Sequence, residues 1–452
     1  MAQPTLVVAP QLRPLVGSVP VPSDKSIGHR AVLLAGLANG ISELRGFSHG
    51  EDNVATARAL VAMGATIEGL GARDLRVKGV GLFGLHEPAG ALDCGNSGTT
   101  MRLLSGVLAA QPFQSVLVGD ASLSRRPMMR VVGPLRARGA ILEGAPHPRR
   151  QGEITAPLRI GPLGEDVYLG PLSYESPFSS AQVKSALLLS GLFAHGVTLF
   201  KEPLLSRDHT ERLLLSLGVP LRTSATVVEL DPAGWSGQLP AFELDLPGDP
   251  SAAAFLVVAA QLVPGSRVTA RSVCTNPTRT GLFEIARGMG AGIEVSPLGE
   301  RGGEPVGDVS AWYEPHRGMK VGGELVPRAI DEIPVLCALA ARGHGTTRIT
   351  NAEELRVKES DRIAAMAGVL RAFGVRCEEL PDGLEIEGTQ TPLRAAEIDS
   401  LGDHRIAMTA AVLGLLAEGP SRVRDVACIA TSFPRFAGTL RALGASIRVE
   451  EG

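Results

Sequence analysis

Aromatic side chains and lysines are scarce in this 452-residue chain. It contains three tyrosines, two tryptophans and, among its 44 basic residues, only six lysines. With 44% apolar residues, the chain is typical of a globular protein whose core is built from small aliphatic side chains. Because arginine is so strongly preferred, a lysine at a motif position is notable.

Paired cysteines and long apolar runs are also missing. The five cysteines, Cys94, Cys274, Cys337, Cys377 and Cys428, are odd in number and widely spaced, and no C-x-x-C pair occurs. We therefore expect neither a zinc site nor a disulfide framework, which fits a reducing cytoplasm. No apolar run reaches the length of a membrane span, and no secretory signal is recognisable. The net charge of −3 argues against a nucleic-acid or anionic-membrane partner.

The stretch from Val19 to Gly40 predicts a buried helix with a basic start. Prolines end an extended segment, Asp24 and the neighbouring serines offer N-cap oxygens, and Lys25 and Arg30 lie on the first turns before an apolar run. Helix N-termini carry unpaired N–H groups and a partial positive charge, so added cations create a site for anions.

Five further stretches repeat this design, with a small polar start followed by an almost wholly apolar run. They are Ser97–Leu108, Ser180–Gly191, Asp249–Val258, Ile330–Leu339 and Asp403–Leu413. Helices that are apolar all round are core helices, so the chain should contain six buried helices whose only polar parts are their N-terminal ends.

A second repeat, Leu-x-x-x-Gly followed by a short β-like segment, supports the number six. It recurs around Gly64, Gly139, Gly218, Gly290, Gly374 and Gly444. Each copy predicts an amphipathic helix such as Val54–Met63, a glycine cap and a strand such as Ala65–Gly69. At this length more than one core is expected.

Two chain crossings define the expected lobes. A first strand, Thr5–Ala9, and a proline-spaced segment precede three repeats, and a Pro-Gly-Asp-Pro linker near residue 248 precedes three more. We expect one lobe of residues 23–247 and another of residues 1–22 plus 248–452, with a hinge and a cleft between them.

Several polar clusters have both a structural and a functional interpretation. Glycines around Asn96 and Ser97 could form a backbone nest for an anion, or only a turn. Asp208 or Thr210 could simply cap the helix that follows. The charged run 351–362 could be the start of a surface helix. Gly79–Gly84 matches G-x-G-x-x-G, but the segment after it does not read as a helix, so dinucleotide binding is not expected.

Arginines near residue 130 are predicted to be solvated. Arg130, Arg136 and Arg138 fall on a helix after Pro127, and we expect all three, together with one of Arg125 and Arg126, to face water.

Taken together, six motifs resemble those of the 5-enolpyruvylshikimate-3-phosphate synthase family. They are Lys25-Ser-Ile-Gly-His-Arg30, Gly95-Asn-Ser-Gly-Thr99, Arg126-Pro127, Ser180-Ala-Gln182, Arg356-Val-Lys-Glu-Ser-Asp-Arg362 and Asp403-His-Arg405. They come in the family's order over nearly the whole chain. The form Ser180-Ala-Gln-Val-Lys-Ser185 with Arg207-Asp-His-Thr210 resembles the less common bacterial branch of the family.

The resemblance implies the reaction and the fold. Phosphoenolpyruvate would transfer its enolpyruvyl group to the 5-hydroxyl of shikimate 3-phosphate, releasing phosphate, in the shikimate pathway to chorismate and aromatic amino acids. The fold would be α/β: a two-lobed inside-out α/β barrel, each lobe made of three β-α-β-α-β-β repeats, with the active site in the interdomain cleft. The first strand would pair in the C-terminal lobe.

The resemblance also assigns residues. Phosphoenolpyruvate would be held by Lys25, Gly98, Arg126, Gln182, Arg362 and Arg405. Shikimate 3-phosphate would be held by Lys25, Ser26, Arg30, Ser180, Gln182, Arg207, Asp331 and Lys358. Asp331 would be the base, with Glu359 and Lys25 as proton-transfer partners, and neither a metal nor an organic cofactor would be needed. We expect a monomer.

Three positions depart from the family pattern. A second serine before the glutamine is replaced by Ala181, an asparagine by Glu354, and a C-terminal lysine by Thr431, which puts one phosphoenolpyruvate contact in doubt. Gly98 leaves space for the inhibitor glyphosate, which should compete with phosphoenolpyruvate.

Two alternatives remain. Enolpyruvyl transfer to UDP-N-acetylglucosamine would require Lys-Asn in place of Lys25-Ser26 and a reactive loop cysteine. In a non-catalytic anion-binding repeat scaffold, Asp331, Glu359 and Lys25 would serve only as caps and ion pairs. Measuring phosphate release with each acceptor distinguishes these two alternatives from the reaction that the resemblance implies.

Overall fold

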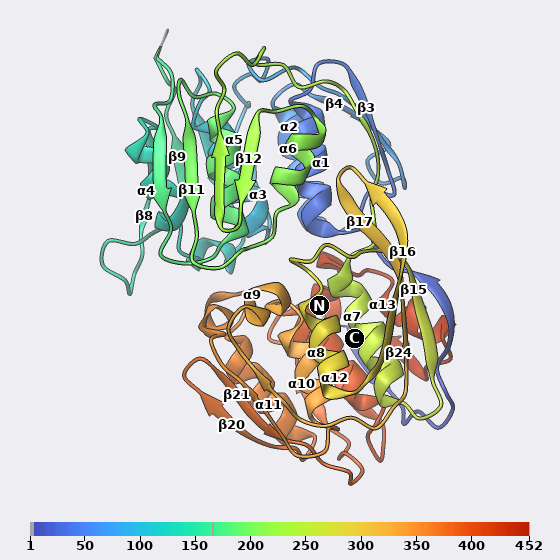
Figure 1. The fold of residues 1–452 in the computed structure, drawn as a ribbon. Helices are drawn as coiled ribbons and strands as arrows, with labels where there is room; N and C mark the ends of the chain where they lie inside the picture. The colour runs from blue at the N-terminus through green and yellow to red at the C-terminus, as the bar shows by residue number, and fades with distance from the viewer. Residues whose placement is uncertain (1–3, 165–166, 452) are drawn as a thin grey trace. The chain divides into compact units, whose positions relative to one another are not determined.

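The computed structural model describes residues 4–164 and 167–451 (Figure 1). The chain divides into two compact units. Unit 1 comprises Met1–Pro22, Pro247–Glu300 and Pro305–Gly452, and unit 2 comprises Ser23–Leu246 and Arg301–Glu304. Residues 1–3, 165–166 and 452, which the expected lobe ranges include, lie outside the described residues.

Unit 2 contains three four-stranded sheets in its described part. Their strand orders are β14-β3-β5-β4, β6-β7-β9-β8 and β10-β11-β13-β12. The strands are β3 (Ile41–Arg45), β4 (Thr66–Glu68), β5 (Leu75–Lys78), β6 (Leu92–Asp93), β7 (Ser115–Val118), β8 (Leu142–Pro146), β9 (Ile154–Ile160), β10 (Leu172–Glu175), β11 (Thr198–Lys201), β12 (Leu221–Ser224), β13 (Val227–Leu230) and β14 (Glu243–Asp245). The helices are α1 (Lys25–Gly36), α2 (Glu51–Ala62), α3 (Gly98–Leu108), α4 (Met129–Ala137), α5 (Ala181–Gly191) and α6 (His209–Ser216).

Unit 1 has the same plan in the residues described. Its sheet orders are β22-β23-β1-β24, β16-β17-β15-β2 and β18-β19-β21-β20. The strands are β1 (Thr5–Val8), β2 (Val16–Pro20), β15 (Arg267–Cys274), β16 (Gly292–Arg301), β17 (Glu304–Trp312), β18 (Lys320–Val321), β19 (Thr346–Ile349), β20 (Arg376–Leu380), β21 (Gly383–Glu387), β22 (Glu397–Asp399), β23 (Ser421–Arg424) and β24 (Ile447–Glu450). The helices are α7 (Pro250–Leu262), α8 (Gly281–Met289), α9 (Leu325–Ala329), α10 (Ile333–Ala340), α11 (Arg362–Ala372), α12 (His404–Gly414) and α13 (Phe436–Ala442).

The sheets follow the expected β-α-β-α-β-β order. In one of them β6 pairs parallel with β7, β7 pairs antiparallel with β9, and β8 completes the sheet antiparallel to β9. The sheets of β10–β13 and β18–β21 repeat this pairing. A parallel pair needs a crossover connection, which here is a core helix such as α3 or α5. The first strand pairs with β23 and β24, as predicted.

Besides β1, two further strands reach their sheets from distant parts of the sequence. β14 pairs parallel with β3, and β2 pairs parallel with β15. β14 ends just before the chain leaves unit 2, and β2 ends just before it enters unit 2. Each of these two sheets therefore has, at one edge, a strand far from its partner in sequence.

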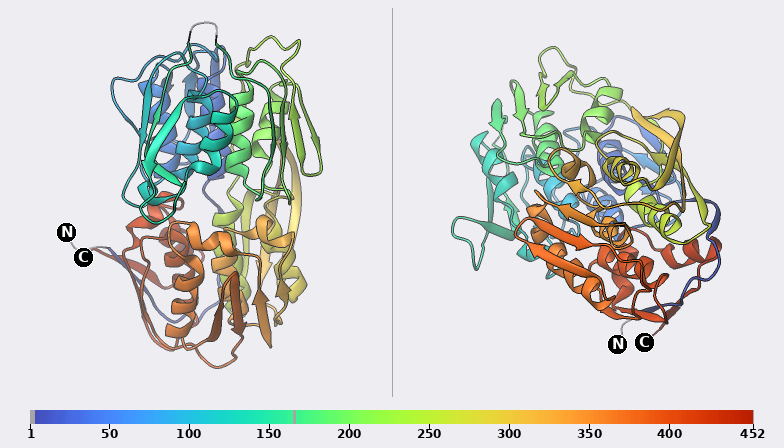
Figure 2. Two further views of the ribbon diagram at one scale, coloured as in Figure 1. Left: turned by 90° about the vertical axis from the view of Figure 1, so that its left-hand side faces the viewer. Right: turned by 60° about the horizontal axis from the view of Figure 1, so that its bottom comes forward.

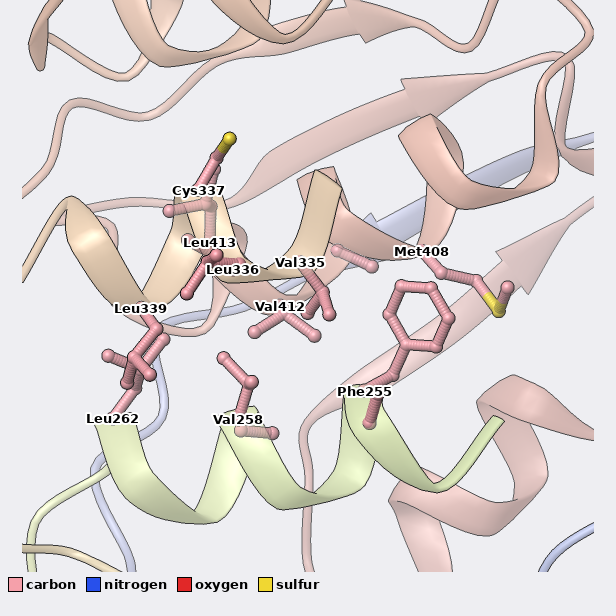
Figure 3. Packing of buried hydrophobic residues seen from close by; sticks show 14 of the residues in the cluster. Phe255, Val258, Leu262, Val335, Leu336, Cys337, Leu339, Met408, Val412 and Leu413 are labelled. Atoms are coloured by element: carbon pink, nitrogen blue, oxygen red, sulfur yellow. The ribbon is translucent and has the colours of Figure 1, made fainter. Parts of the chain in front are cut away.

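The six predicted core helices are buried. Every residue of α7, α10 and α12 is buried, and most of α1, α3 and α5 is buried as well. Figure 3 shows α7, α10 and α12 of unit 1 packing through Phe255, Val258, Leu336, Leu339 and Val412. In unit 2, α3 packs on α5, and Figure 2 shows the helices of this unit lying between strands.

The segment after β5 is not helical, so the G-x-G-x-x-G match has no dinucleotide-binding context. Its glycines have a packing role instead: a Cβ on Gly79 would lie 2.3 Å from the carbonyl oxygen of Ala38. No helix in the described part of the chain is long and apolar enough to cross a membrane.

Candidate active site

The N-terminus of α1 presents Lys25 in a fixed position. The side chain of Asp24 caps the helix by accepting a hydrogen bond from the Ile27 amide at 2.9 Å. Lys25 Nζ pairs with Asp52 Oδ2 at 2.8 Å, and these side chains are only 17% and 9% exposed. The side-chain amide of Asn53 donates, through Nδ2, to the backbone carbonyl of Lys25. Lys25 is thus a partly accessible cation held at a helix start.

Arg30 is buried at the junction of three helices. Its Nη1 donates to the Ser26 carbonyl at 2.8 Å, its Nη2 to Ser185 Oγ at 2.6 Å, and its Nε to Thr210 Oγ1 at 2.6 Å. Burial lowers the pKa of Arg30 to about 10, although the charges of Glu211 and Asp24 act in the opposite direction. At neutral pH Arg30 is therefore still a cation, and it is fixed by α1, α5 and α6.

Gly98 and Arg126 meet at the start of α3. Ser97 caps the helix by accepting from the Thr100 amide at 3.1 Å, and Gly98 is the first helical residue. Arg126 Nη2 donates to Asn96 Oδ1 at 2.6 Å. A Cβ on Gly98 would lie 3.3 Å from Arg126 Nη1. The structure therefore brings these two predicted residues together.

The predicted backbone nest at this helix start is only partly available. The Gly95 amide donates to Asp93 Oδ1, and the Ser97 amide donates to the Cys94 carbonyl. Because these two amides are used internally, the interpretation as a turn holds for them.

Arg102 is a site residue that our residue assignment missed. Its Nη1 donates to Gln182 Oε1 at 2.7 Å and its Nη2 to the Pro127 carbonyl at 3.2 Å. Gln182 in turn donates to Thr99 Oγ1 at 2.9 Å. Arg102 lies one helical turn after Gly98 and so on the same face of α3, a spacing that could have identified it.

The residues around α5 and α6 show whether Asp208 or Thr210 simply caps the helix that follows them. Ser180 caps α5, with its Oγ 3.5 Å from the Val183 amide. Asp208 occupies the N-cap position of α6 without a capping hydrogen bond, and its Oδ2 accepts from Arg212 Nε at 2.9 Å instead. Thr210 receives the hydrogen bond of Arg30. Arg207, directly before this turn, is half-buried.

In unit 1, Asp331 lies between two arginines. Arg362 Nη1 donates to its Oδ1 at 3.3 Å, and Arg405 Nη1 donates to its backbone carbonyl at 2.9 Å. Arg405 Nη2 lies 3.8 Å from Asp331 Oδ2. The Asp331 side chain is 15% exposed, so the carboxylate is partly accessible.

Arg362 also holds Glu359 and Asp403. Its Nη2 donates to Glu359 Oε2, and its Nε donates to Asp403 Oδ2 at 2.8 Å. Burial would lower the pKa of Arg362, but the charges of Asp403, Glu359 and Asp331 raise it above its ordinary value. Burial would raise the pKa of Asp403, but Arg362 holds it below its ordinary value. Both groups are therefore charged at neutral pH. Lys358, beside Glu359, is half-buried.

The predicted residues divide between the two units. Unit 2 holds a set rich in cations, with Lys25, Ser26, Arg30, Gly98, Arg126, Ser180, Gln182 and Arg207. Unit 1 holds Asp331, Lys358, Glu359, Arg362 and Arg405, with Asp403 joining them. Unlike the first set, the second matches three carboxylates to three cations.

The arginines after Pro127 differ from the prediction. Arg125 and Arg136 are exposed and Arg126 is half-buried, but Arg138 is buried, so its expected solvation was wrong. Arg138 donates to Ser190 Oγ at 2.6 Å, Thr198 Oγ1 at 2.9 Å and the Gly170 carbonyl at 3.0 Å. Arg130 is half-buried and lies 4.2 Å from the centre of the Phe178 ring.

The thiols are poor nucleophiles. Burial raises the pKa of Cys94 and that of Cys428 to about 12, and it also raises the pKa values of Cys337 and Cys377. Since the thiolate is the reactive form, these four cysteines are unreactive at neutral pH. Among the described residues, no group of three or more His, Cys, Asp and Glu side chains could hold a metal ion.

Basic side chains lie at the starts of buried helices, and carboxylates are held by arginines. This arrangement is typical of an α/β enzyme that handles anionic substrates. The comparisons with known proteins identify the enzyme family. The family model of EPSP synthase (3-phosphoshikimate 1-carboxyvinyltransferase) matches residues 10–440. The chain belongs to this family of transferases.

Individual relatives agree over nearly the whole chain. The 3-phosphoshikimate 1-carboxyvinyltransferases of Geobacter sulfurreducens and Methylococcus capsulatus are each 49% identical, over 95% and 96% of this chain and 96% of either relative. A solved structure of EPSP synthase from Acinetobacter baumannii is 40% identical, covers 99% of this chain and 100% of its own, and has a TM-score of 0.86.

Proposed function

We propose that this protein transfers the enolpyruvyl group of phosphoenolpyruvate to the 5-hydroxyl of shikimate 3-phosphate, releasing phosphate. Membership of the EPSP synthase family supports the reaction. The observation that carries the assignment to residues is the cluster in which Asp331 and Glu359 share Arg362, because it offers two partly accessible carboxylates beside a fixed cation.

The reaction is an addition followed by an elimination. Asp331 takes the proton of the 5-hydroxyl, whose oxygen bonds to C2 of phosphoenolpyruvate, while C3 receives a proton from the ammonium group of Lys25 or from the protonated form of Glu359. The tetrahedral adduct then loses phosphate from C2 and a proton from C3, which restores the double bond. No electrons enter or leave, so the chemistry requires no redox cofactor and depends on proton transfer, alignment and charge stabilisation.

The two sets of residues would divide this work. The substrates together carry roughly four to five negative charges at neutral pH. The cation-rich set of unit 2 suits their phosphates: Lys25, Gly98, Arg126 and Gln182 for phosphoenolpyruvate, and Ser26, Arg30, Ser180 and Arg207 for shikimate 3-phosphate. The charge-matched set of unit 1 suits acid–base chemistry, with Lys358 on shikimate 3-phosphate and Arg362 and Arg405 on the carboxylate of phosphoenolpyruvate.

We further propose that residues 23–247 and residues 1–22 plus 248–452 act as two lobes on one pair of substrates, in a cytoplasmic monomer. Glyphosate, which carries a phosphonate and a carboxylate, should compete with phosphoenolpyruvate for Arg126 and the space beside Gly98. The unreactive cysteines do not favour transfer to UDP-N-acetylglucosamine, for which a reactive cysteine is expected.

Phosphate release on mixing both substrates tests the proposal. We expect turnover with shikimate 3-phosphate and none when UDP-N-acetylglucosamine replaces it. Calorimetric binding of shikimate 3-phosphate without phosphate release would instead support a non-catalytic scaffold. Light scattering measures the molar mass in solution and so tests whether the protein is a monomer.

A further inference from the structure

The β16–β17 hairpin places a carboxylate from the second half of the chain in unit 2. The sheet of these strands belongs to unit 1, but residues Arg301–Glu304 at the hairpin tip belong to unit 2. Glu304 is only 2% exposed. A buried carboxylate is costly unless it is paired, so its partner is significant.

That partner is His209, the first residue of α6. The His209 Nδ1 and Glu304 Oε1 atoms are 2.7 Å apart, and both side chains are buried. An ionised carboxylate can only accept, so the ring N–H donates. A second bond supports the same turn, because Arg212 Nη1 donates to the Gly303 carbonyl at 2.9 Å. The tip itself requires glycines, since φ is +56° at Gly302 and +77° at Gly303.

The turn that the hairpin holds carries two links to the anion-binding residues. Arg207 lies two residues before His209. Thr210, the residue after His209, accepts from Arg30 Nε and bonds to Ser185 Oγ at 2.6 Å. A shift of the first turn of α6 would therefore move Arg207 and loosen Arg30.

We propose that Glu304 is a positioning residue for the binding of shikimate 3-phosphate, acting through His209 on the first turn of α6. The inference rests on the proposed function, in which Arg30 and Arg207 hold this substrate. It assigns a role to a side chain 95 residues away from its partner, on a hairpin that lies outside every motif of the sequence.

Calorimetric titration of the full-length enzyme with shikimate 3-phosphate tests the inference. We expect Glu304→Ala to weaken binding about tenfold, as loss of one charge-assisted hydrogen bond predicts. Glu304→Gln should retain most of the affinity, since its amide oxygen can still accept from the ring. Glu300→Ala is the matched control, because Glu300 is exposed on the same hairpin, and it should bind like the wild type. The KM for phosphoenolpyruvate at saturating shikimate 3-phosphate should stay within about twofold.

An unchanged dissociation constant in a folded Glu304→Ala variant overturns the inference and leaves the hairpin a purely structural role. If that variant does not fold, the wild type still decides. Coupling is reciprocal, so shikimate 3-phosphate must slow hydrogen exchange in the peptide covering residues 299–306, and no slowing overturns the inference. Failure of the wild type to bind shikimate 3-phosphate would instead refute the proposed function.

Discussion

Replacing Gly98 by alanine should separate stability from affinity. A Cβ at this position would lie 2.6 Å from Arg102 Nη1 and 3.3 Å from Arg126 Nη1, both ends of flexible side chains. Ordinary contact begins at 3.4 Å, so Arg102 must retreat by most of an ångström. That retreat strains or breaks its 2.7 Å bond to Gln182.

The magnitude follows from that bond. A hydrogen bond to a charged group contributes about 1.5–3 kcal/mol, and each 1.4 kcal/mol is about a factor of ten in affinity. We therefore expect the KM for phosphoenolpyruvate and the inhibition constant of glyphosate to rise about tenfold or more. The cost in unfolding free energy should be smaller than the value of this bond, because the better helix propensity of alanine, roughly 0.5–1 kcal/mol in a helix interior, partly offsets its loss.

Phosphate-release kinetics with a glyphosate titration, together with thermal unfolding, measure all three quantities. Gly133→Ala is a suitable control: it also lies within a helix, and its added Cβ would meet only Met129 Cε at 3.7 Å. That variant should keep wild-type kinetics. If Gly98→Ala folds normally but leaves both the KM and the inhibition constant unchanged, the placement of phosphoenolpyruvate beside Gly98 is wrong.

Three further substitutions test the remaining assignments. Asp331→Asn keeps the shape of the side chain but removes the base, so kcat should fall about 10²–10⁴-fold while calorimetry still detects shikimate 3-phosphate binding; a near-normal kcat would exclude Asp331 as the base. The pKa of Asp403 lies below its ordinary value of 3.8, so its ionised form stabilises the fold above that pH and the contribution is lost as pH falls through the folded-state pKa. Urea unfolding should therefore show the wild type losing stability faster than Asp403→Asn below about pH 4, and parallel pH profiles would contradict this. Arg138→Ala should cost about 3 kcal/mol of unfolding free energy and exposed Arg136→Ala less than about 1, with kcat per folded molecule unchanged; equal costs would show that the buried hydrogen bonds of Arg138 contribute little.

Local patterns in the sequence were sufficient to predict the core helices. A run that is apolar all round after a polar start has one stable solution, which is a buried helix with a capped end. Asp24 and Asp403 do cap α1 and α12, as their positions suggest. The pairing of the edge strands β2 and β14 with distant partners was not predictable in this way. β14 is three residues long, and so short a segment has no readable periodicity.

The failed predictions share a physical cause, which is a partner distant in sequence. Arg138 reads as solvated because the residues around it are charged or small, yet its partners come from β11, from the end of α5 and from a loop. Arg102 lies within the predicted helix stretch Ser97–Leu108, but its link to the site depends on Gln182 of α5, 80 residues away in sequence. A charged side chain that looks exposed from its neighbours can therefore be buried by elements that the sequence does not place.

The charge distribution explains why the two sets of site residues differ in how well the sequence identified them. In unit 1, Arg362 lies within a dense charged motif and is neutralised by carboxylates three and 41 residues away. Its burial is tolerated because each lost water contact is replaced by an ion pair, and the motif itself supplies one of the partners. In unit 2, Arg30 and Arg126 donate to hydroxyl, amide and carbonyl oxygens, and the charges of Glu211 and Asp24 compensate that of Arg30 only in part. Neutral partners do not by themselves mark an anion site, because buried Arg138 is held in the same way. The distinguishing feature of Arg30 and Arg126 is their place near the starts of buried helices. The sequence could predict these cations from their place at helix starts, but not the neutral partners that keep their charge available.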